Sequence, residues 1–147
     1  KILIGETTAE HVKKTVGAVI AKEPIETTIR GRDLITGLPR EVVITDSDIR
    51  EAMAQSIDIL LEASKEVLET TPPEILSDIM KRGVHLVGGG ALIKGLDELL
   101  AETLKLPVTV AEDPLTAIAR GAGIILEDLE LYRSVLIESE DDIPSSK

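Results

Sequence analysis

Three consecutive glycines, Gly88 to Gly90, are the residues whose type and spacing are best suited to holding a ligand. They directly follow the run Val-His-Leu-Val at 84–87, which is typical of a buried strand. Because glycine has no Cβ, the main chain here can turn sharply and come within contact distance of a flat ligand. The same triplet is also typical of a plain strand-to-helix turn. Both interpretations stay open on these residues alone.

Glu10 and Lys13 are a second candidate pair, on a helix predicted over residues 7–17. Residues three apart share a helix face, so both side chains could point at one ligand. The alternative is a solvated face of charged residues, whose ion pairs contribute little to stability. Spacing alone does not separate these two interpretations.

The remaining polar residues carry weaker signals. Asp113 followed by Pro114 is typical of a helix start, with the carboxylate as N-cap and proline in the first turn. His11 and His85 are isolated, and no second His or Cys completes a ligand set. We therefore expect no metal site.

The first 44 residues predict a helix and a β-hairpin. In the helix over 7–17, Thr7 or Thr8 can serve as N-cap and Gly17 can end the helix. Residues 25–44 are rich in Thr, Ile and Val, and glycines and a proline interrupt them, Gly31 among these. This pattern predicts two strands joined by a loop.

Two helices are predicted next. Thr45 and Asp48 resemble a capping box, and apolar residues then recur at helical spacing to about residue 70. Pro72 and Pro73 end that helix and can start another, because proline is tolerated in a first turn. The second helix is expected to end near Arg82.

The second half of the chain has the pattern of an α/β protein. A strand at 84–87, a helix with Leu96 and Leu100 on one face, a strand at 107–110 and a further helix follow in order. The order β-α-β-α predicts parallel strands with right-handed crossovers. Two strands are too few for a finished sheet.

Composition excludes several function classes. The 147 residues carry a formal net charge of −11 and include no Phe, no Trp and one Tyr, so neither basic patches nor aromatic stacking favours a nucleic-acid partner. There is no cysteine, which fits a reducing compartment such as the cytoplasm. No apolar run approaches the ~20 residues that a membrane-spanning helix needs.

Four segments together resemble one protein family. The run LVGGGALIKGLD at 86–97 is similar to the adenosine motif of the actin, sugar-kinase and heat-shock-chaperone superfamily. IGETTAEHVK at 4–13, RGRDLITGLP at 30–39 and AEDPLTAIA at 111–119 resemble, within that superfamily, the MreB family of bacterial actin-like rod-shape-determining proteins. The resemblance extends to about residue 127, and so many matches in the same order make it specific.

This resemblance implies an α/β fold: part of the second lobe of the actin-like (ribonuclease H-like) ATPase fold, with a small α/β subdomain and an incomplete parallel-sheet subdomain. Residues 1–82 would form the small upper subdomain. Residues 83–137 would form the C-terminal part of the larger lower subdomain, and 138–147 a disordered acidic tail.

The resemblance also implies a cofactor, ATP, whose adenosine would lie between the two subdomains. The glycine loop would approach it from one side, and the charged pair on the first helix from the other. The positions that match the family's binding residues are Glu10, Lys13, Gly88, Gly89, Gly90 and Ala91. The groups that hold Mg²⁺ and the phosphates would lie outside this chain, so we expect this chain by itself to have no ATPase activity.

The implied function is that of a cytoskeletal protein that polymerises into filaments and determines cell shape. Its partners would be further filament subunits and the cell-wall synthesis machinery, at the inner face of the cell membrane, with membrane attachment through segments outside this chain. Two alternatives stay open. One is another ATPase of the superfamily, a chaperone or a cell-division or pilus adaptor. The other is a non-catalytic interaction domain.

Overall fold

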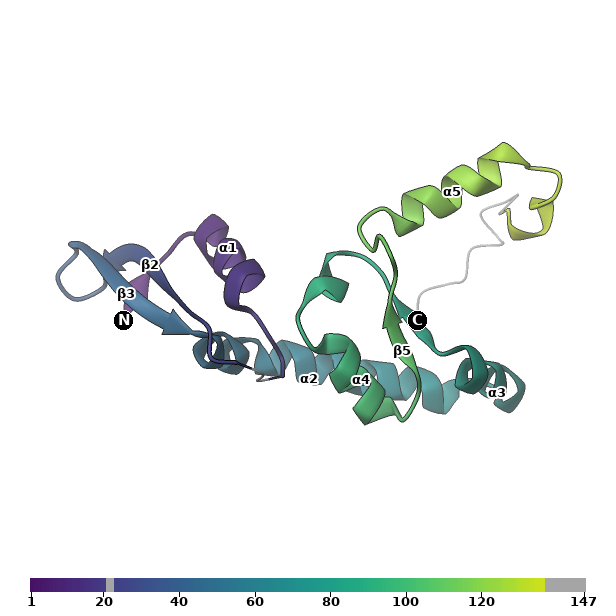
Figure 1. Ribbon diagram of the computed structural model, residues 1–147, viewed down its shortest axis with the longest axis horizontal. Helices are drawn as coiled ribbons and strands as arrows, with labels where there is room; N and C mark the ends of the chain where they lie inside the picture. The colour runs from purple at the N-terminus through teal and green to yellow at the C-terminus, as the bar shows by residue number, and fades with distance from the viewer. Residues whose placement is uncertain (21–22, 137–147) are drawn as a thin grey trace.

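The computed structural model describes residues 1–20 and 23–136, which form two separate sheets and the helices around them (Figure 1). The first sheet contains three strands in the order β1-β2-β3, and the second contains β4 and β5. The elements are β1 (Ile2–Leu3), α1 (Glu6–Val16), β2 (Glu26–Asp33), β3 (Pro39–Thr45), α2 (Asp46–Thr70), α3 (Pro73–Arg82), β4 (Val84–Leu86), the 3-10 turn η1 (Gly89–Leu92), α4 (Leu96–Leu104), β5 (Val108–Val110), α5 (Ala117–Glu127) and the 3-10 turn η2 (Arg133–Val135).

The predicted hairpin is confirmed, and a third strand extends its sheet. β2 pairs antiparallel with β3, and β1 pairs antiparallel with the other edge of β2. The prediction that Gly31 interrupts a strand is wrong, because Gly31 lies within β2 opposite Arg40. A Cβ on Gly31 would stand 2.4 Å from the carbonyl oxygen of Leu3. Glycine is therefore needed here for the close approach of β1.

Helix α1 covers one face of this sheet. Val12 and Val16 are four residues apart, are both buried, and pack with Ile29 of β2. The prediction of a threonine N-cap is wrong, because the N-cap is Gly5 and no side chain caps the helix. The chain turns directly after β1, and the amide of Ala9 donates to the carbonyl of Gly5 at 3.0 Å. The helix therefore begins before either threonine can cap it.

The loop of the hairpin is organised by a carboxylate. Asp33 is buried, and its carboxylate accepts hydrogen bonds from the amides of Ile35 at 2.8 Å and Thr36 at 3.0 Å. The guanidinium of Arg40 also donates to it at 2.8 Å. These donors, led by the Thr36 amide, hold the pKa of Asp33 well below its usual value.

Helix α2 connects the two sheets. The predicted capping box is confirmed: the Asp48 amide donates to the Thr45 hydroxyl, and the Asp48 carboxylate accepts from the Thr45 amide at 2.8 Å. Near its start, Ile49 packs on the cluster around α1. Two turns further on, Ile57 packs with Leu96 and Leu100 of α4. A single helix therefore contributes to both apolar cores.

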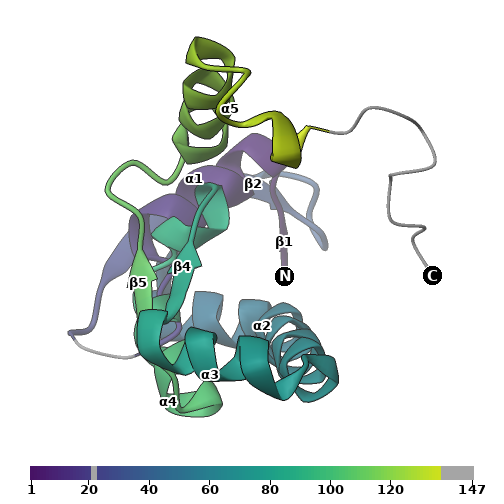
Figure 2. The same ribbon diagram turned by 90° about the vertical axis from the view of Figure 1, so that its right-hand side faces the viewer.

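The second sheet is parallel, as predicted. β4 and β5 run side by side with Val84 opposite Val108, and α4 connects them. Pro73 stands in the first turn of α3, which ends at Arg82, so that prediction is also confirmed. α5 lies beyond the carboxyl ends of β4 and β5 (Figure 2). Within residues 1–20 and 23–136, no helix has the length and apolarity to cross a membrane.

An apolar groove of about 690 Å³ runs between α2, α3, α4 and the second sheet. Leu60 and Val67 of α2 line one side, and Val84, Leu86 and Leu100 line the other. The division at residue 82 stays a prediction, and the expected tail at 138–147 lies outside the described residues.

Removing the N-cap of α2 should destabilise the fold. Replacing Thr45→Ala removes the side-chain oxygen that satisfies the Asp48 amide, and we expect a loss of about 1 kcal/mol in the free energy of unfolding. Urea unfolding of the purified chain measures this. Thr45→Ser keeps the hydroxyl and should stay close to wild type, whereas equal stabilities for all three proteins would contradict the capping role.

The Asp33 carboxylate should make stability depend on pH. Its pKa is lower in the folded than in the unfolded chain. Its contribution is therefore complete above the unfolded pKa of about 4 and is lost as the pH falls towards the folded value. At pH 7 the wild-type chain should have a higher urea midpoint of unfolding than Asp33→Asn. The difference between the two midpoints should shrink below about pH 4. Asp58→Asn, at an exposed position of α2, is the control. A gap that does not change with pH would contradict the prediction.

Candidate functional site

The loops that leave β4 and β5 meet at the carboxyl ends of the two strands. The amide of Gly88 donates to the carbonyl of Pro114 at 2.6 Å, and the amide of Ala111 donates to the carbonyl of Leu86 at 3.0 Å. In open α/β sheets, ligands bind in the crevice outside these ends. The glycine loop therefore lies where this kind of sheet usually holds a ligand.

The three glycines differ in what the fold requires of them. Gly88 has φ +79°, a conformation that a residue with a side chain adopts only with strain. Gly89 and Gly90 do not have positive φ. A Cβ on Gly90 would meet nothing within 4 Å, and one on Gly89 would meet only a Leu115 methyl, at 3.8 Å. The backbone conformation therefore explains glycine at position 88, whereas neither backbone conformation nor close packing requires glycine at positions 89 and 90. Gly90 also lines the apolar groove beside α2.

The charged pair on α1 is exposed to solvent. Glu10 forms an ion pair with Lys14, its neighbour one turn on, at 2.7 Å. This hydrogen bond from Lys14 lowers the pKa of Glu10 below its ordinary value, so the carboxyl is ionised near neutral pH. Lys13 is exposed on the same helix. Both side chains are accessible, and neither is part of the apolar core.

Two hydrogen bonds of Lys94 join the end of α1 to the end of the glycine loop. The Lys94 carbonyl accepts from the amide of Val19 at 2.9 Å, and its ammonium donates to the carbonyl of Thr15 at 3.0 Å. With a rise of 1.5 Å per residue, Lys13 and Glu10 lie roughly 3 and 8 Å along the helix from Thr15. Figure 1 shows α1 and the turn after β4 on the same side of α2, facing one another. The two sets of predicted site residues therefore lie on neighbouring elements.

The turn at Asp113 lies against the glycine loop. The sequence favoured a structural role for this turn, and the family resemblance implies a place near the adenine base. The prediction that Asp113 is an N-cap is wrong: α5 begins at Ala117, with Thr116 as N-cap. Asp113 instead accepts a hydrogen bond from the Thr116 hydroxyl. Two residues of the turn reach the glycine loop, Pro114 through its carbonyl and Leu115 through its side chain. The meeting of parallel strand ends was the signal that could have indicated this.

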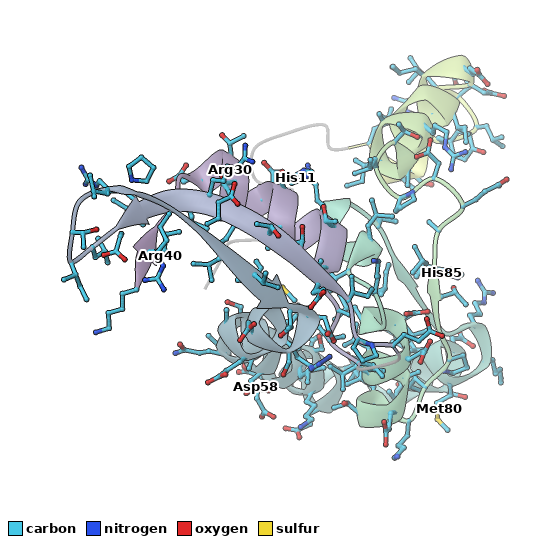
Figure 3. The ribbon with its side chains drawn as sticks, turned by 60° about the vertical axis from the view of Figure 1, so that its left-hand side comes forward. His11, Arg30, Arg40, Asp58, Met80 and His85 are labelled. Atoms are coloured by element: carbon cyan, nitrogen blue, oxygen red, sulfur yellow. The ribbon has the colours of Figure 1, made fainter. Side chains whose placement is uncertain are left out.

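No metal site accompanies the loop in the part of the chain that the structure describes. No group of three or more His, Cys, Asp or Glu side chains there could hold a metal ion. Figure 3 shows the two histidines on separate elements, His11 on α1 and His85 on β4. His85 pairs across the sheet with the hydroxyl of Thr109, at 2.9 Å.

Comparison with known proteins decides the family. The family model for MreB/Mbl protein matches residues 1–134. The chain belongs to the MreB/Mbl family. This membership favours the cytoskeletal prediction over the chaperone and adaptor alternatives.

Two curated MreB/Mbl relatives show how much of the family's length is present. Cell shape-determining protein Mbl of Bacillus subtilis (strain 168) is 47% identical over 131 residues, which are 88% of this chain and 39% of that protein. Cell shape-determining protein MreB of Escherichia coli (strain K12) is 42% identical over 139 residues, which are 94% of this chain and 40% of that protein. The chain thus spans about two fifths of the length of these relatives.

A solved structure of the family has the same fold. MreB5 of Spiroplasma citri bound to ADP superposes with a TM-score of 0.85 at 34% identity, covering 90% of this chain and 41% of that one. The fold of this chain is therefore that of an actin-like protein, as predicted. The six predicted binding residues themselves stay a prediction.

Proposed function

We propose that the protein to which this chain belongs binds ATP with its adenosine between α1 and the glycine loop. The observation that carries this proposal is the placement of the glycine loop. It lies at the carboxyl ends of β4 and β5, and Lys94 at its far end is hydrogen-bonded to the end of α1. The ADP-bound state of the related MreB5 supports the proposal. The main chain from Gly88 to Ala91 would face the adenosine on one side, and Glu10 and Lys13 would face it on the other.

We further propose that the protein determines cell shape, as the names of its MreB and Mbl relatives state for those proteins, and that it does so by polymerising into filaments. ATP and its hydrolysis would supply the free-energy difference between a form of the protein that assembles and one that does not. Residues outside this chain would hold Mg²⁺ and the phosphates. The filaments would lie at the inner face of the cell membrane and organise the cell-wall synthesis machinery.

The loop of the β2–β3 hairpin supports self-association. Leu34, Ile35 and Leu38 are 55%, 86% and 65% exposed, at a tip whose shape is already fixed by Asp33. Arg30 and Arg40 lie on the strands that lead to it (Figure 3). Apolar side chains clustered at an exposed tip are typical of an interaction surface.

Filling the space above the glycine loop should weaken nucleotide binding. In the full-length protein, Gly90→Val places a side chain where the adenosine is proposed to lie, and we expect at least about a tenfold rise in the Kd for ATP, equivalent to roughly 1.4 kcal/mol. Calorimetric titration measures it. Gly121→Ala is the matched control, since a Cβ there also meets nothing within 4 Å. Unchanged affinity in a folded Gly90→Val protein would contradict the proposed site.

A charge at the hairpin tip should prevent polymerisation. Ile35→Asp in the full-length protein should shift most of the protein from pellet to supernatant in an ATP-dependent sedimentation assay, because a carboxylate would lose solvation in an apolar contact. The control is Thr28→Asp, at an exposed position of β2 away from the tip. Normal pelleting of the Ile35 variant would exclude the tip from the filament contact.

A further inference from the structure

The segment after α1 and the segment after the glycine loop meet at one backbone contact. Residue Ala18, just after α1, forms an isolated parallel bridge with Lys94, just after the glycine loop. The loop reaches this contact through successive tight turns: Ala91 donates to Gly88 at 3.2 Å, and Ile93 donates to Gly90 at 3.1 Å. Two backbone hydrogen bonds therefore lie between the glycine triplet and Lys94.

The side chain of Lys94 forms a solvent-exposed hydrogen bond with the last turn of α1. The last turn of a helix presents carbonyls that have no partner within the helix, and a cation there is favourable both as a hydrogen-bond donor and with the helix dipole. In this chain, the Lys94 ammonium donates a hydrogen bond to the Thr15 carbonyl in the last turn of α1, at 3.0 Å. The contact joins residues 79 positions apart in the sequence.

A cavity of about 460 Å³ lies beside this contact and is lined by Ala18, Ile20, Glu23, Ile25, Asp46, Lys94 and Gly95. Gly95 has φ +81°, and a Cβ there would stand 3.0 Å from the Cβ of Ile20. Ile20 therefore packs closely on Gly95, and the Lys94 ammonium adds a hydrogen bond to the end of α1.

We propose that Lys94 is a positioning residue for nucleotide binding: it fixes α1, and with it Glu10 and Lys13, relative to the glycine loop without touching the nucleotide. The inference rests on the proposed function, because it assigns a role at the same site. Its chemical basis is one charged hydrogen bond across two elements that would contact the same ligand.

The test uses ADP titrations of the full-length protein. Lys94→Met keeps an unbranched side chain, one atom shorter, and removes the donor. We expect the Kd for ADP to rise roughly two- to tenfold, the value of one hydrogen bond. Lys94→Arg retains a donor and should restore most of the affinity. Lys65→Met removes a lysine of α2 that pairs with Glu62 at 2.8 Å and should leave the Kd unchanged.

A double-mutant cycle separates positioning from a general structural effect. If Lys94 acts through α1, then Lys94→Met should cost much less affinity in a protein that already carries Lys13→Met. Additive losses, or wild-type affinity for Lys94→Met, would overturn the inference. The Gly90→Val variant distinguishes this outcome from failure of the proposed site. If Gly90→Val binds ADP normally, the site itself is wrong; if it binds weakly while Lys94→Met binds normally, only the role of Lys94 is wrong.

Discussion

The contact between the end of α1 and Lys94 is the constraint on which the site depends. One core lies around Val12, Val16 and Ile29, and the other lies around Ile57, Leu96 and Leu100. Helix α2 contributes to both cores and sets their separation. Packing of Val12 and Val16 on the first sheet sets which face of α1 is buried. The bridge at Ala18 and the ammonium of Lys94 join the C-terminal end of α1 to the segment that leaves the glycine loop.

Local signals in the sequence predicted most of the elements. The capping box of Thr45 and Asp48 and the proline start of α3 involve neighbouring residues, so the sequence alone contains the necessary information. The parallel pairing of β4 with β5 followed from their order along the chain. The family resemblance added the actin-like fold, which the residues by themselves limited only to the α/β class.

The errors arose where distant residues decide the local structure. Gly31 was predicted to interrupt a strand, because nothing nearby in the sequence shows that β1 approaches it closely. The turn at Asp113 was predicted to cap a helix, but its position against Gly88 depends on the meeting of two strand ends. The contact of Lys94 with Thr15 spans 79 positions and has no local pattern. Such contacts follow from the fold and not from spacing along the chain.

Several apolar surfaces of the described residues are open. The groove beside α2 and the exposed side chains Leu115, Ile118 and Leu126 are examples. The relatives contain more than twice the length matched here. We expect the rest of the full-length protein to cover part of these surfaces and to supply the groups that handle phosphate. Under the proposed function, the described residues would form the adenosine half of the nucleotide site.

Photo-crosslinking of the full-length protein with 8-azido-ATP, followed by mass spectrometry, tests the central claim most directly. If α1 and the glycine loop face one nucleoside, labelled peptides should come from both α1 and the strand-end loops at 88–91 and 113–116, and excess ATP should abolish both labels. Labelling confined to one of these places, or found elsewhere in the chain, would contradict the claim that the two walls enclose one ligand.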